Sequence, residues 1–275
     1  MSVKRVSFKI GDCFLFGVFL FLCVATISGC SSNSMEFCLE SGECDLAVNL
    51  VKVSGEIPID PNDSFWGNAD QYSPQTVELN PQMITNPKWP DPSVKSVKIG
   101  GVQNGSEIGL LLEWDDFSLE NKIAVSATHT DQAALMFPLS SRNELPSITM
   151  GSDNEIVNIW QWRAIWEPSL ASNSRKRHPG SLDRSSVNTP VRSPVEDLTA
   201  AGFSTLTTQA EQNVLGHGIW QNKTWRVVFK RPLVNSDNAD VQFKNSTVMA
   251  IAVWNGANRE RNGQKGISNW ILLRL

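Results

Sequence analysis

The stretch that decides the fold is IGLLLEW, residues 108–114, in which every second residue is a large apolar one. Alternate residues of an extended strand share one face, and here they are Ile108, Leu110, Leu112 and Trp114. The polar pair Asp115–Asp116 follows directly. The pattern predicts a β-strand that buries one face in a hydrophobic core and ends at the two aspartates.

Similar short apolar segments recur along the chain, at residues 133–137, 157–162, 225–231, 248–254 and 271–275. Residues 248–254 are almost continuously apolar, which is typical of a strand buried on both faces. No segment keeps a helical period over several turns, and the chain contains 14 Pro and 18 Gly. The spacing of the segments predicts a mainly all-β protein, an antiparallel β-sandwich.

The composition excludes two broad classes of protein. Of the 275 residues, 41% are hydrophobic and 19% are charged. An intrinsically disordered chain would have fewer apolar and more charged residues. The formal net charge is -4, from 24 basic and 28 acidic residues, so we expect no nucleic-acid partner.

The N-terminus has the features of an export signal. Three basic residues among the first nine precede an apolar run over residues 14–27, which is too short to span a membrane. The run ends in ISGC, residues 27–30, which is similar to the lipobox of bacterial lipoproteins. We therefore predict a signal peptide over residues 1–29, a lipid on Cys30, a tether over residues 30–54 and an exported, membrane-anchored protein. The alternative is an ordinary signal peptide in which Cys30 occurs by chance.

Two further cysteines, Cys38 and Cys44, follow the lipobox. In an oxidising compartment they can form a disulfide that closes a small loop, and the alternative is a pair of free thiols. The sequence contains no Cys-x-x-Cys-His motif, which excludes covalent attachment of a c-type haem, and no zinc-finger spacing.

A polar segment interrupts the strand pattern at residues 168–199 and contains SRKRHPGSLDRSSVNTPVRSP. It has too few apolar residues for a buried strand, so we predict one long surface insertion in a domain that spans residues 55–275.

Motifs for hydrolysis and phosphate binding are absent: the sequence has no Gly-x-Ser-x-Gly, no His-Glu-x-x-His, no P-loop and no Gly-x-Gly-x-x-Gly. Asp115 and Asp116 are neighbours on a strand and point to opposite faces, so they cannot share a proton. We therefore predict no catalytic residues.

Seven segments, in this order along the chain, resemble one known family. They are LLLEWDD (110–116), DQAALMFP (131–138), TMGS (149–152), VNIWQWRA (157–164), AAGFSTLT (200–207), GIWQNKTWRVVFKRPL (218–233) and AIAVWNGANRERNGQKGISNWILL (250–273). The family is that of the haem b-binding γ subunits of type II dimethyl sulfoxide reductases, which includes ethylbenzene dehydrogenase, dimethyl sulfide dehydrogenase, selenate and chlorate reductases and relatives of nitrite oxidoreductase. The resemblance implies a β-sandwich with a few short helices and a non-covalent haem b at the edge of the sandwich.

The resemblance also implies that one Met and one Lys hold the haem iron. Met150 precedes Gly151 in a turn-like segment and matches the family's methionine better than Met136, which lies in an apolar run where a core Met is the default. Lys265 lies in NGQKGISNW and matches the family's Asn-Gly-x-Lys-x-x-Ser-x-Trp segment. Lys230, at a strand end, is the second choice. The expected axial ligands are Met150 and Lys265, with Met136 and Lys230 as the runner-up pair.

Three arginines, Arg163, Arg231 and Arg261, are candidates to pair with the haem propionates, and the sequence does not decide between them.

The resemblance implies an electron-transfer subunit of a periplasmic molybdoenzyme. Its partners would be a catalytic α subunit with a molybdopterin cofactor, an iron–sulfur β subunit and an external carrier such as a c-type cytochrome. The alternative hypothesis is a lipid-anchored carbohydrate-binding β-sandwich module, because similar sandwiches bind sugars on Trp platforms.

Overall fold

The computed structural model describes residues 44–122, 128–139, 145–167 and 193–275. Every described residue belongs to one compact unit. Its strands are β1 Cys44–Asn49, β2 Val51–Lys52, β3 Gln75–Glu78, β4 Asn80–Pro81, β5 Ser96–Gln103, β6 Glu107–Asp115, β7 Gln132–Pro138, β8 Val157–Arg163, β9 Val195–Ala200, β10 Thr207–Thr208, β11 Leu215–Gln221, β12 Thr224–Pro232, β13 Thr247–Trp254, β14 Gly266–Ile267 and β15 Trp270–Arg274. The described helices are three short 3₁₀ turns, η1 Ser64–Gly67, η2 Ala69–Gln71 and η3 Ala164–Trp166.

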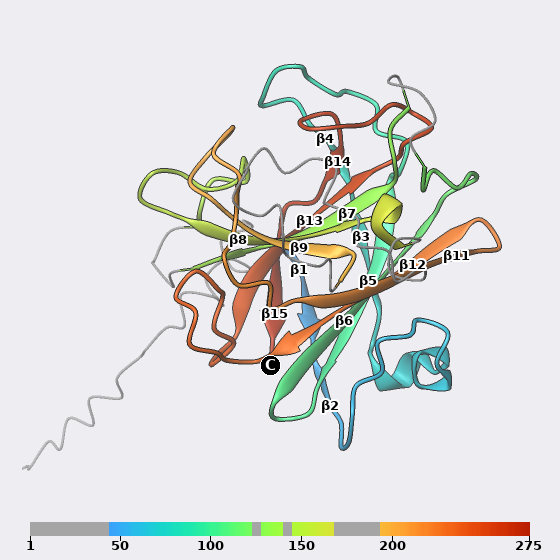
Figure 1. The fold of residues 1–275 in the computed structure, drawn as a ribbon, viewed down its shortest axis with the longest axis vertical. Coiled ribbons are helices and arrows are strands. Elements are labelled where there is room, and N and C mark those ends of the chain that lie inside the picture. The colour runs from blue at the N-terminus through green and yellow to red at the C-terminus, as the bar shows by residue number, and fades with distance from the viewer. Residues whose placement is uncertain (1–43, 123–127, 140–144, 168–192) are drawn as a thin grey trace, which may run out of the picture. The chain divides into compact units, whose positions relative to one another are not determined.

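The strands form two sheets (Figure 1). The nine-stranded sheet has the order β1-β15-β13-β7-β8-β9-β10, with β14 paired to β13 and β4 paired to β14. The six-stranded sheet has the order β11-β12-β6-β5-β2, with β3 paired to β5. Most neighbours are antiparallel, and the parallel pairs are β1 with β15 and β2 with β5. The predicted β-sandwich, with a few short helices, is confirmed.

The main hydrophobic core lies between the two sheets and takes residues from both. All four residues of the face predicted for IGLLLEW belong to it. Three tryptophans meet there: the ring centroid of Trp162 lies 4.7 Å from that of Trp225 and 6.0 Å from that of Trp114. Replacing any one of them with Ala would cost about 3–5 kcal/mol of stability.

The outer face of the six-stranded sheet is covered by the segment between β2 and β3. Ile57, Trp66 and Tyr72 of this segment pack on Leu111 and Val228 of the sheet. Both faces of β6 and β12 are therefore buried, which explains why the alternation in IGLLLEW is interrupted by the apolar Leu111.

The structure places strands in two segments for which the sequence predicted none. The expected tether, residues 30–54, contains β1 and β2, and β1 pairs in parallel with β15 at the far end of the chain. The expected insertion, residues 168–199, contains the start of β9. Sequence periodicity missed β9 because its buried side chains include Glu196 and Asp197, which are held by polar partners instead of apolar contacts. Residues 168–192 lie outside the described residues.

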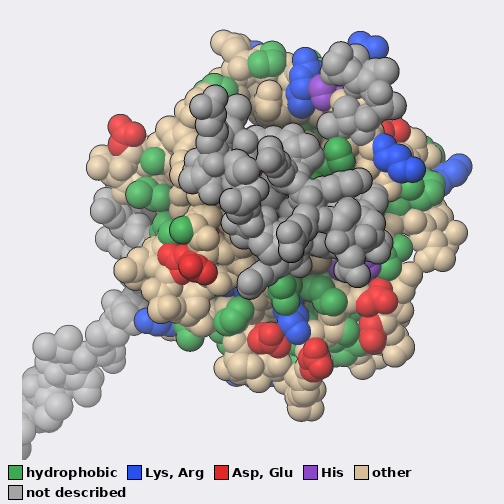
Figure 2. Space-filling view, viewed as in Figure 1, with side chains coloured by type: hydrophobic (Ala, Val, Ile, Leu, Met, Phe, Trp, Pro, Cys, Tyr) green, Lys and Arg blue, Asp and Glu red, His purple; other side chains and the backbone are tan. Residues whose placement is uncertain are grey.

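Residues 1–29, Cys30 and Cys38 also lie outside the described residues. Cys44 is disulfide-bonded, and Cys38 is its expected partner. Within the described part of the chain, no helix has the length and apolar character needed to cross a membrane. Figure 2 shows acidic and basic side chains interspersed over the described part of one face, without a continuous basic field.

Candidate functional site

A cavity of about 440 Å³ lies on the outer face of the nine-stranded sheet. Its floor is formed by the neighbouring strands β13, β7 and β8, whose register places nine side chains in three rows of three. All nine point to the same face because they alternate along their strands. The rows are Ala250, Met136 and Ile159; Ala252, Ala134 and Gln161; and Trp254, Gln132 and Arg163.

The residue types of the floor give it a flat, mainly apolar shape with one polar end. Ala134, Ala250 and Ala252 carry only methyl groups, so a broad planar ligand can approach the sheet closely. Polar side chains occur in the last two rows only, at Gln132, Gln161 and Arg163. Such a floor suits a large planar group with an apolar body and a charged edge.

Met150 lies in the wall of this cavity, on a tight turn. Its φ of 72° is in the left-handed region, which is uncommon for a residue with a side chain, and Gly151 follows with a φ of 78°. The Gly151 N–H donates to the Ser147 carbonyl at 2.8 Å, and the Met150 carbonyl accepts from the Gly202 N–H at 2.8 Å. The turn is thus fixed from both sides, and backbone strain of this kind is a feature of ligand sites.

Glycine is the only residue type that fits at position 151 of this turn. A Cβ atom built at Gly151 would lie 2.3 Å from the Glu155 carbonyl oxygen, which is well inside van der Waals contact. A steric requirement therefore explains why a glycine follows Met150. Gly151 lets the chain turn so that Met150 faces the cavity.

Lys265 lies in the same cavity wall, directly before β14. Its Nζ atom lies 4.7 Å from the centroid of the Trp254 ring. Removal of the ammonium from water lowers the pKa of Lys265 from 10.5 to about 8. No hydrogen bond or ion pair joins this amine to another residue in the described ranges, so its lone pair is available to a ligand once the proton has left.

The loop that carries Lys265 is anchored by two buried polar residues that the sequence analysis missed. The Glu260 carboxylate is fully buried and accepts hydrogen bonds from Trp89 Nε1 at 3.0 Å and from the Ser93 N–H at 2.9 Å. Gln82 Nε2 donates to the Gly263 carbonyl at 2.9 Å. No sequence signal identifies these anchors, because their partners lie more than 160 residues away along the chain.

The runner-up residues are placed differently from each other. Met136 lies on the cavity floor, in the row with Ala250. Lys230 belongs to the six-stranded sheet and does not line the cavity. Its Nζ donates to the Ile57 carbonyl at 2.9 Å and lies 3.4 Å from a Glu107 carboxylate oxygen.

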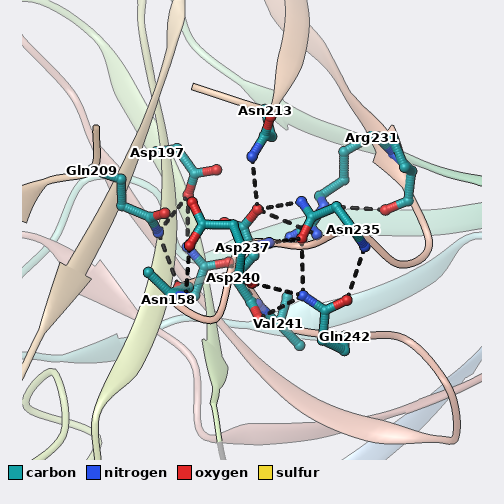
Figure 3. Close-up of polar contacts among 12 residues, drawn as sticks. Asn158, Asp197, Gln209, Asn213, Arg231, Asn235, Asp237, Asp240, Val241 and Gln242 are labelled. Carbon is teal, nitrogen blue, oxygen red and sulfur yellow. Dashed lines mark hydrogen bonds and ion pairs between the residues drawn. The ribbon is translucent and has the colours of Figure 1, made fainter. Parts of the chain in front are cut away.

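The three arginines are also separated by the fold. Arg163 and Arg261 line the cavity, whereas Arg231 does not. Arg231 is buried in a polar network at a different place, 3.5 Å from an Asp240 oxygen (Figure 3). Arg163 lies at the cavity edge, where it pairs with Glu196 at 3.1 Å.

The fold and site define a β-sandwich protein with a ligand cavity on the outer face of one sheet and a thioether and an amine in its walls. A family model described as ethylbenzene dehydrogenase matches residues 63–266, well over half of the chain. The chain therefore belongs to the ethylbenzene dehydrogenase family, and the resemblance drawn from the sequence is confirmed.

Three curated relatives carry names of respiratory subunits. The dimethylsulfide dehydrogenase subunit gamma of Rhodovulum sulfidophilum is 28% identical, over 83% of this chain and 81% of the relative. The chlorate reductase subunit gamma of Ideonella dechloratans is 26% identical, over 83% of this chain and 84% of the relative. A Haloferax mediterranei protein, whose description names a respiratory nitrate reductase heme subunit, is 28% identical over 67% of this chain. The match spans only 57% of the Haloferax protein.

Among solved structures, a carbohydrate-binding protein from Bacteroides uniformis covers 83% of this chain and 98% of its own, with 9% identity and a TM-score of 0.44. A family 9 carbohydrate-binding module from Caldicellulosiruptor kristjanssonii covers 83% of this chain and 95% of its own, with 11% identity and a TM-score of 0.36. Similarities this remote carry no information on function.

Proposed function

We propose that this chain binds haem in the cavity and serves as an electron-transfer subunit of an oxidoreductase complex. The observation that carries the proposal is the presence of Met150 and Lys265 in the walls of one cavity, although 114 residues separate them along the chain. The names of the relatives, which are gamma or heme subunits of reductases and dehydrogenases, support the same role.

The residues of the cavity fit an iron porphyrin. A Met thioether is a soft, neutral ligand that favours ferrous iron, and a Lys amine ligates when it is neutral. Burial already brings the pKa of Lys265 down to about 8, which reduces the cost of losing its proton. Bound haem would supply one-electron chemistry through the ferric and ferrous states of its iron.

The other residues of the cavity would bind the haem, orient it and exclude water. The floor of Ala and Ile side chains suits the apolar porphyrin plane. Arg163 and Arg261 would pair with the two propionates, and their position at the polar end would orient the ring. The turn at Met150 and the Glu260-anchored loop would hold the two ligands in place.

The proposed haem is of the b type and is held without covalent bonds. None of the described residues that line the cavity is a cysteine, and the sequence has no Cys-x-x-Cys-His motif. The described lining of the cavity therefore offers no attachment point for thioether bonds to the porphyrin.

The gamma-subunit names of two relatives support further subunits in the same complex, and the resemblance of the sequence suggests which partners these would be. They are a molybdopterin-containing α subunit, an iron–sulfur β subunit and an external carrier such as a c-type cytochrome. Substrate chemistry would take place on the α subunit, and this chain would relay electrons only.

The carbohydrate-binding alternative has no support from the positions of the tryptophans. All ten Trp residues fall within the described residues, and eight are buried. The other two, Trp89 and Trp220, are half-buried and donate hydrogen bonds through their indole N–H groups. A sugar-binding platform would require exposed rings.

The test is an absorption spectrum of the protein purified from a haem-supplied host. We expect a Soret band, and we expect acidified organic solvent to extract the haem from the polypeptide. Protein that folds and contains no haem would overturn the proposal, and haem that stays with the chain after extraction would overturn the non-covalent assignment.

We also propose that the complex faces the periplasm and is anchored through a lipid on Cys30. The lipobox-like ISGC at residues 27–30 supports this anchor. Replacing Cys30 with Ala should leave the precursor unlipidated and release any cleaved product from membranes. An intact mass that shows an unmodified mature chain with a different first residue would contradict the anchor.

A further inference from the structure

A second set of functional groups lies outside the haem cavity, at the ends of β6, β7 and β13. Asp116 follows β6, and Asp131 precedes β7. One carboxylate oxygen each from Asp116, Glu120 and Asp131 lies within 4.8 Å of the others. Asp116 is 1% exposed and Asp131 is fully buried. Two of the three carboxylates are thus buried, and the third, Glu120, is half-buried beside them.

The cluster has no cationic partner within the described part of the chain. Among the residues that the structure describes, no Lys, Arg or His forms an ion pair with any of the three. A buried charge is stable in a protein when it is paired or bound to a metal. The other buried pair of aspartates, Asp197 and Asp240, differs in this respect, because Arg231 lies beside it (Figure 3).

One oxygen of Asp116 points to a missing ligand. Oδ1 of Asp116 accepts from the Ser118 N–H at 3.2 Å and from Asn255 Nδ2 at 3.3 Å. Oδ2 is buried and has no hydrogen-bond partner among the residues that the structure describes. An unsatisfied buried carboxylate oxygen is costly, and the acidic neighbours around it offer no donor.

We propose that Asp116, Glu120 and Asp131 bind a calcium ion. All three groups are hard oxygen ligands, and the cluster contains neither Cys nor His, which excludes a preference for zinc. Ca²⁺ binds oxygens at about 2.3–2.6 Å, so it can contact oxygens that are up to about 5 Å apart. Mg²⁺, with bonds of about 2.0–2.1 Å, would need a tighter cluster.

The position of the cluster gives the ion a structural role beside the haem cavity. The Asp131 carboxylate accepts from the Gly256 N–H at 2.9 Å, which ties the start of β7 to the end of β13. Gln132 and Trp254, the next residues inward on these strands, line the haem cavity. The ion would therefore hold together the end of the sheet that carries the polar row of the cavity floor.

The test uses the mature chain near neutral pH and two measurements that do not involve haem. Tb³⁺ serves as the probe, because Trp225 Nε1 lies 3.1 Å from Asp131 Oδ2 and can sensitise terbium luminescence. We expect luminescence that Ca²⁺ displaces, and a higher unfolding temperature with about 1 mM Ca²⁺ than with chelator.

Two variants test which carboxylates bind the ion. Asp116→Asn should weaken Tb³⁺ and Ca²⁺ binding by about tenfold or more and should unfold at a higher temperature than wild type in chelator, because one buried charge is gone. Asp115→Asn, at the exposed neighbouring carboxylate, should bind as wild type does. If Asp116→Asn does not fold, the half-buried Glu120→Gln takes its place.

The proposal is overturned if wild type shows neither sensitised luminescence nor a shift in unfolding temperature with Ca²⁺. It is equally overturned if Asp116→Asn, or Glu120→Gln in its place, binds as tightly as wild type. Stability that depends on pH but not on Ca²⁺ would show that the carboxylates share protons only. None of these outcomes depends on haem, so the proposed electron-transfer function stands or falls separately.

Discussion

The Nζ atom of Lys265 lies 4.7 Å from the centroid of the Trp254 ring. The ring itself is fixed, because its Nε1 donates to the Asn262 carbonyl at 3.0 Å. A ring face attracts an ammonium group, yet burial outweighs this attraction and lowers the pKa of Lys265 to about 8. Trp254 therefore positions Lys265 at the cavity wall. Burial lowers the pKa of Lys265, so its ammonium group loses a proton more easily.

The first prediction concerns the two proposed axial ligands. A thioether and a neutral amine give a low-spin, six-coordinate haem iron, and either Met150→Ala or Lys265→Ala should abolish the low-spin spectrum. Met150→Ala should also lower the reduction potential, because it removes the ligand that favours ferrous iron. Absorption spectra and a redox titration of each variant measure these changes.

The controls are the runner-up residues. Lys230 lies in the other sheet, so the variant Lys230→Gln should keep the wild-type spectrum. Met136→Leu changes a cavity floor residue to one of similar volume and should also keep it. If Met136→Leu loses low-spin haem while Met150→Ala retains it, Met136 is the ligand.

The second prediction concerns pH. The pKa of Lys265 is about 8 in the folded chain without haem and 10.5 in the unfolded chain, so between these values the unfolded state binds more protons. The free energy of unfolding of the haem-free protein should therefore rise as the pH increases from about 8 to 10.5. Chemical denaturation at several pH values measures this slope, and Lys265→Met should flatten it.

In the haem-bound protein the same lysine should make the spectrum sensitive to acid. Protonation of the amine competes with iron, so the wild-type spectrum should become high-spin as the pH falls. A low-spin spectrum that persists unchanged until the protein unfolds would show that the iron ligand is not an amine.

The third prediction concerns the turn that presents Met150. Gly151→Ala must adopt a φ of 78° and place a Cβ atom 2.3 Å from the Glu155 carbonyl oxygen. We expect a loss of about 2–3 kcal/mol of stability and weaker haem binding, measured by denaturation and haem titration. Gly105→Ala is the matched control, since its φ is 88° and nothing lies within 4 Å of its Cβ position. It should cost only about 1 kcal/mol, and an equal cost at both positions would contradict the clash.

The fourth prediction concerns the buried network in Figure 3. Burial and the neighbouring Asp240 raise the pKa of Asp197 from 3.8 to about 8, so stability should fall as the pH rises between these values. Asp197→Asn keeps an acceptor for Asn158 Nδ2, which lies 2.6 Å from Asp197 Oδ1, and offers a donor toward Asp240. The variant should be more stable than wild type near pH 8.

Urea denaturation near pH 4 and near pH 8 measures this difference. Asp153→Asn, at an exposed carboxylate, should follow wild type at both pH values. If the stability of the wild-type protein does not decrease from pH 4 to pH 8, the raised pKa of Asp197 is contradicted.

The sequence alone predicted the features that depend on neighbouring residues. The alternation in IGLLLEW and the continuous apolar run of β13 each specify a strand and its buried faces, because side chains alternate with a period of two. Motif order also identified the family and singled out Met150 and Lys265 as candidate ligands.

Only the tertiary structure decided which distant residues meet. It brought Met150 and Lys265 into one cavity and left Lys230 and Arg231 outside it. It also paired β1 with β15 and gathered Asp116 and Asp131 around a common centre. Sheet pairing and the burial of polar groups depend on contacts between segments far apart in the chain, and no local period in the sequence records those contacts.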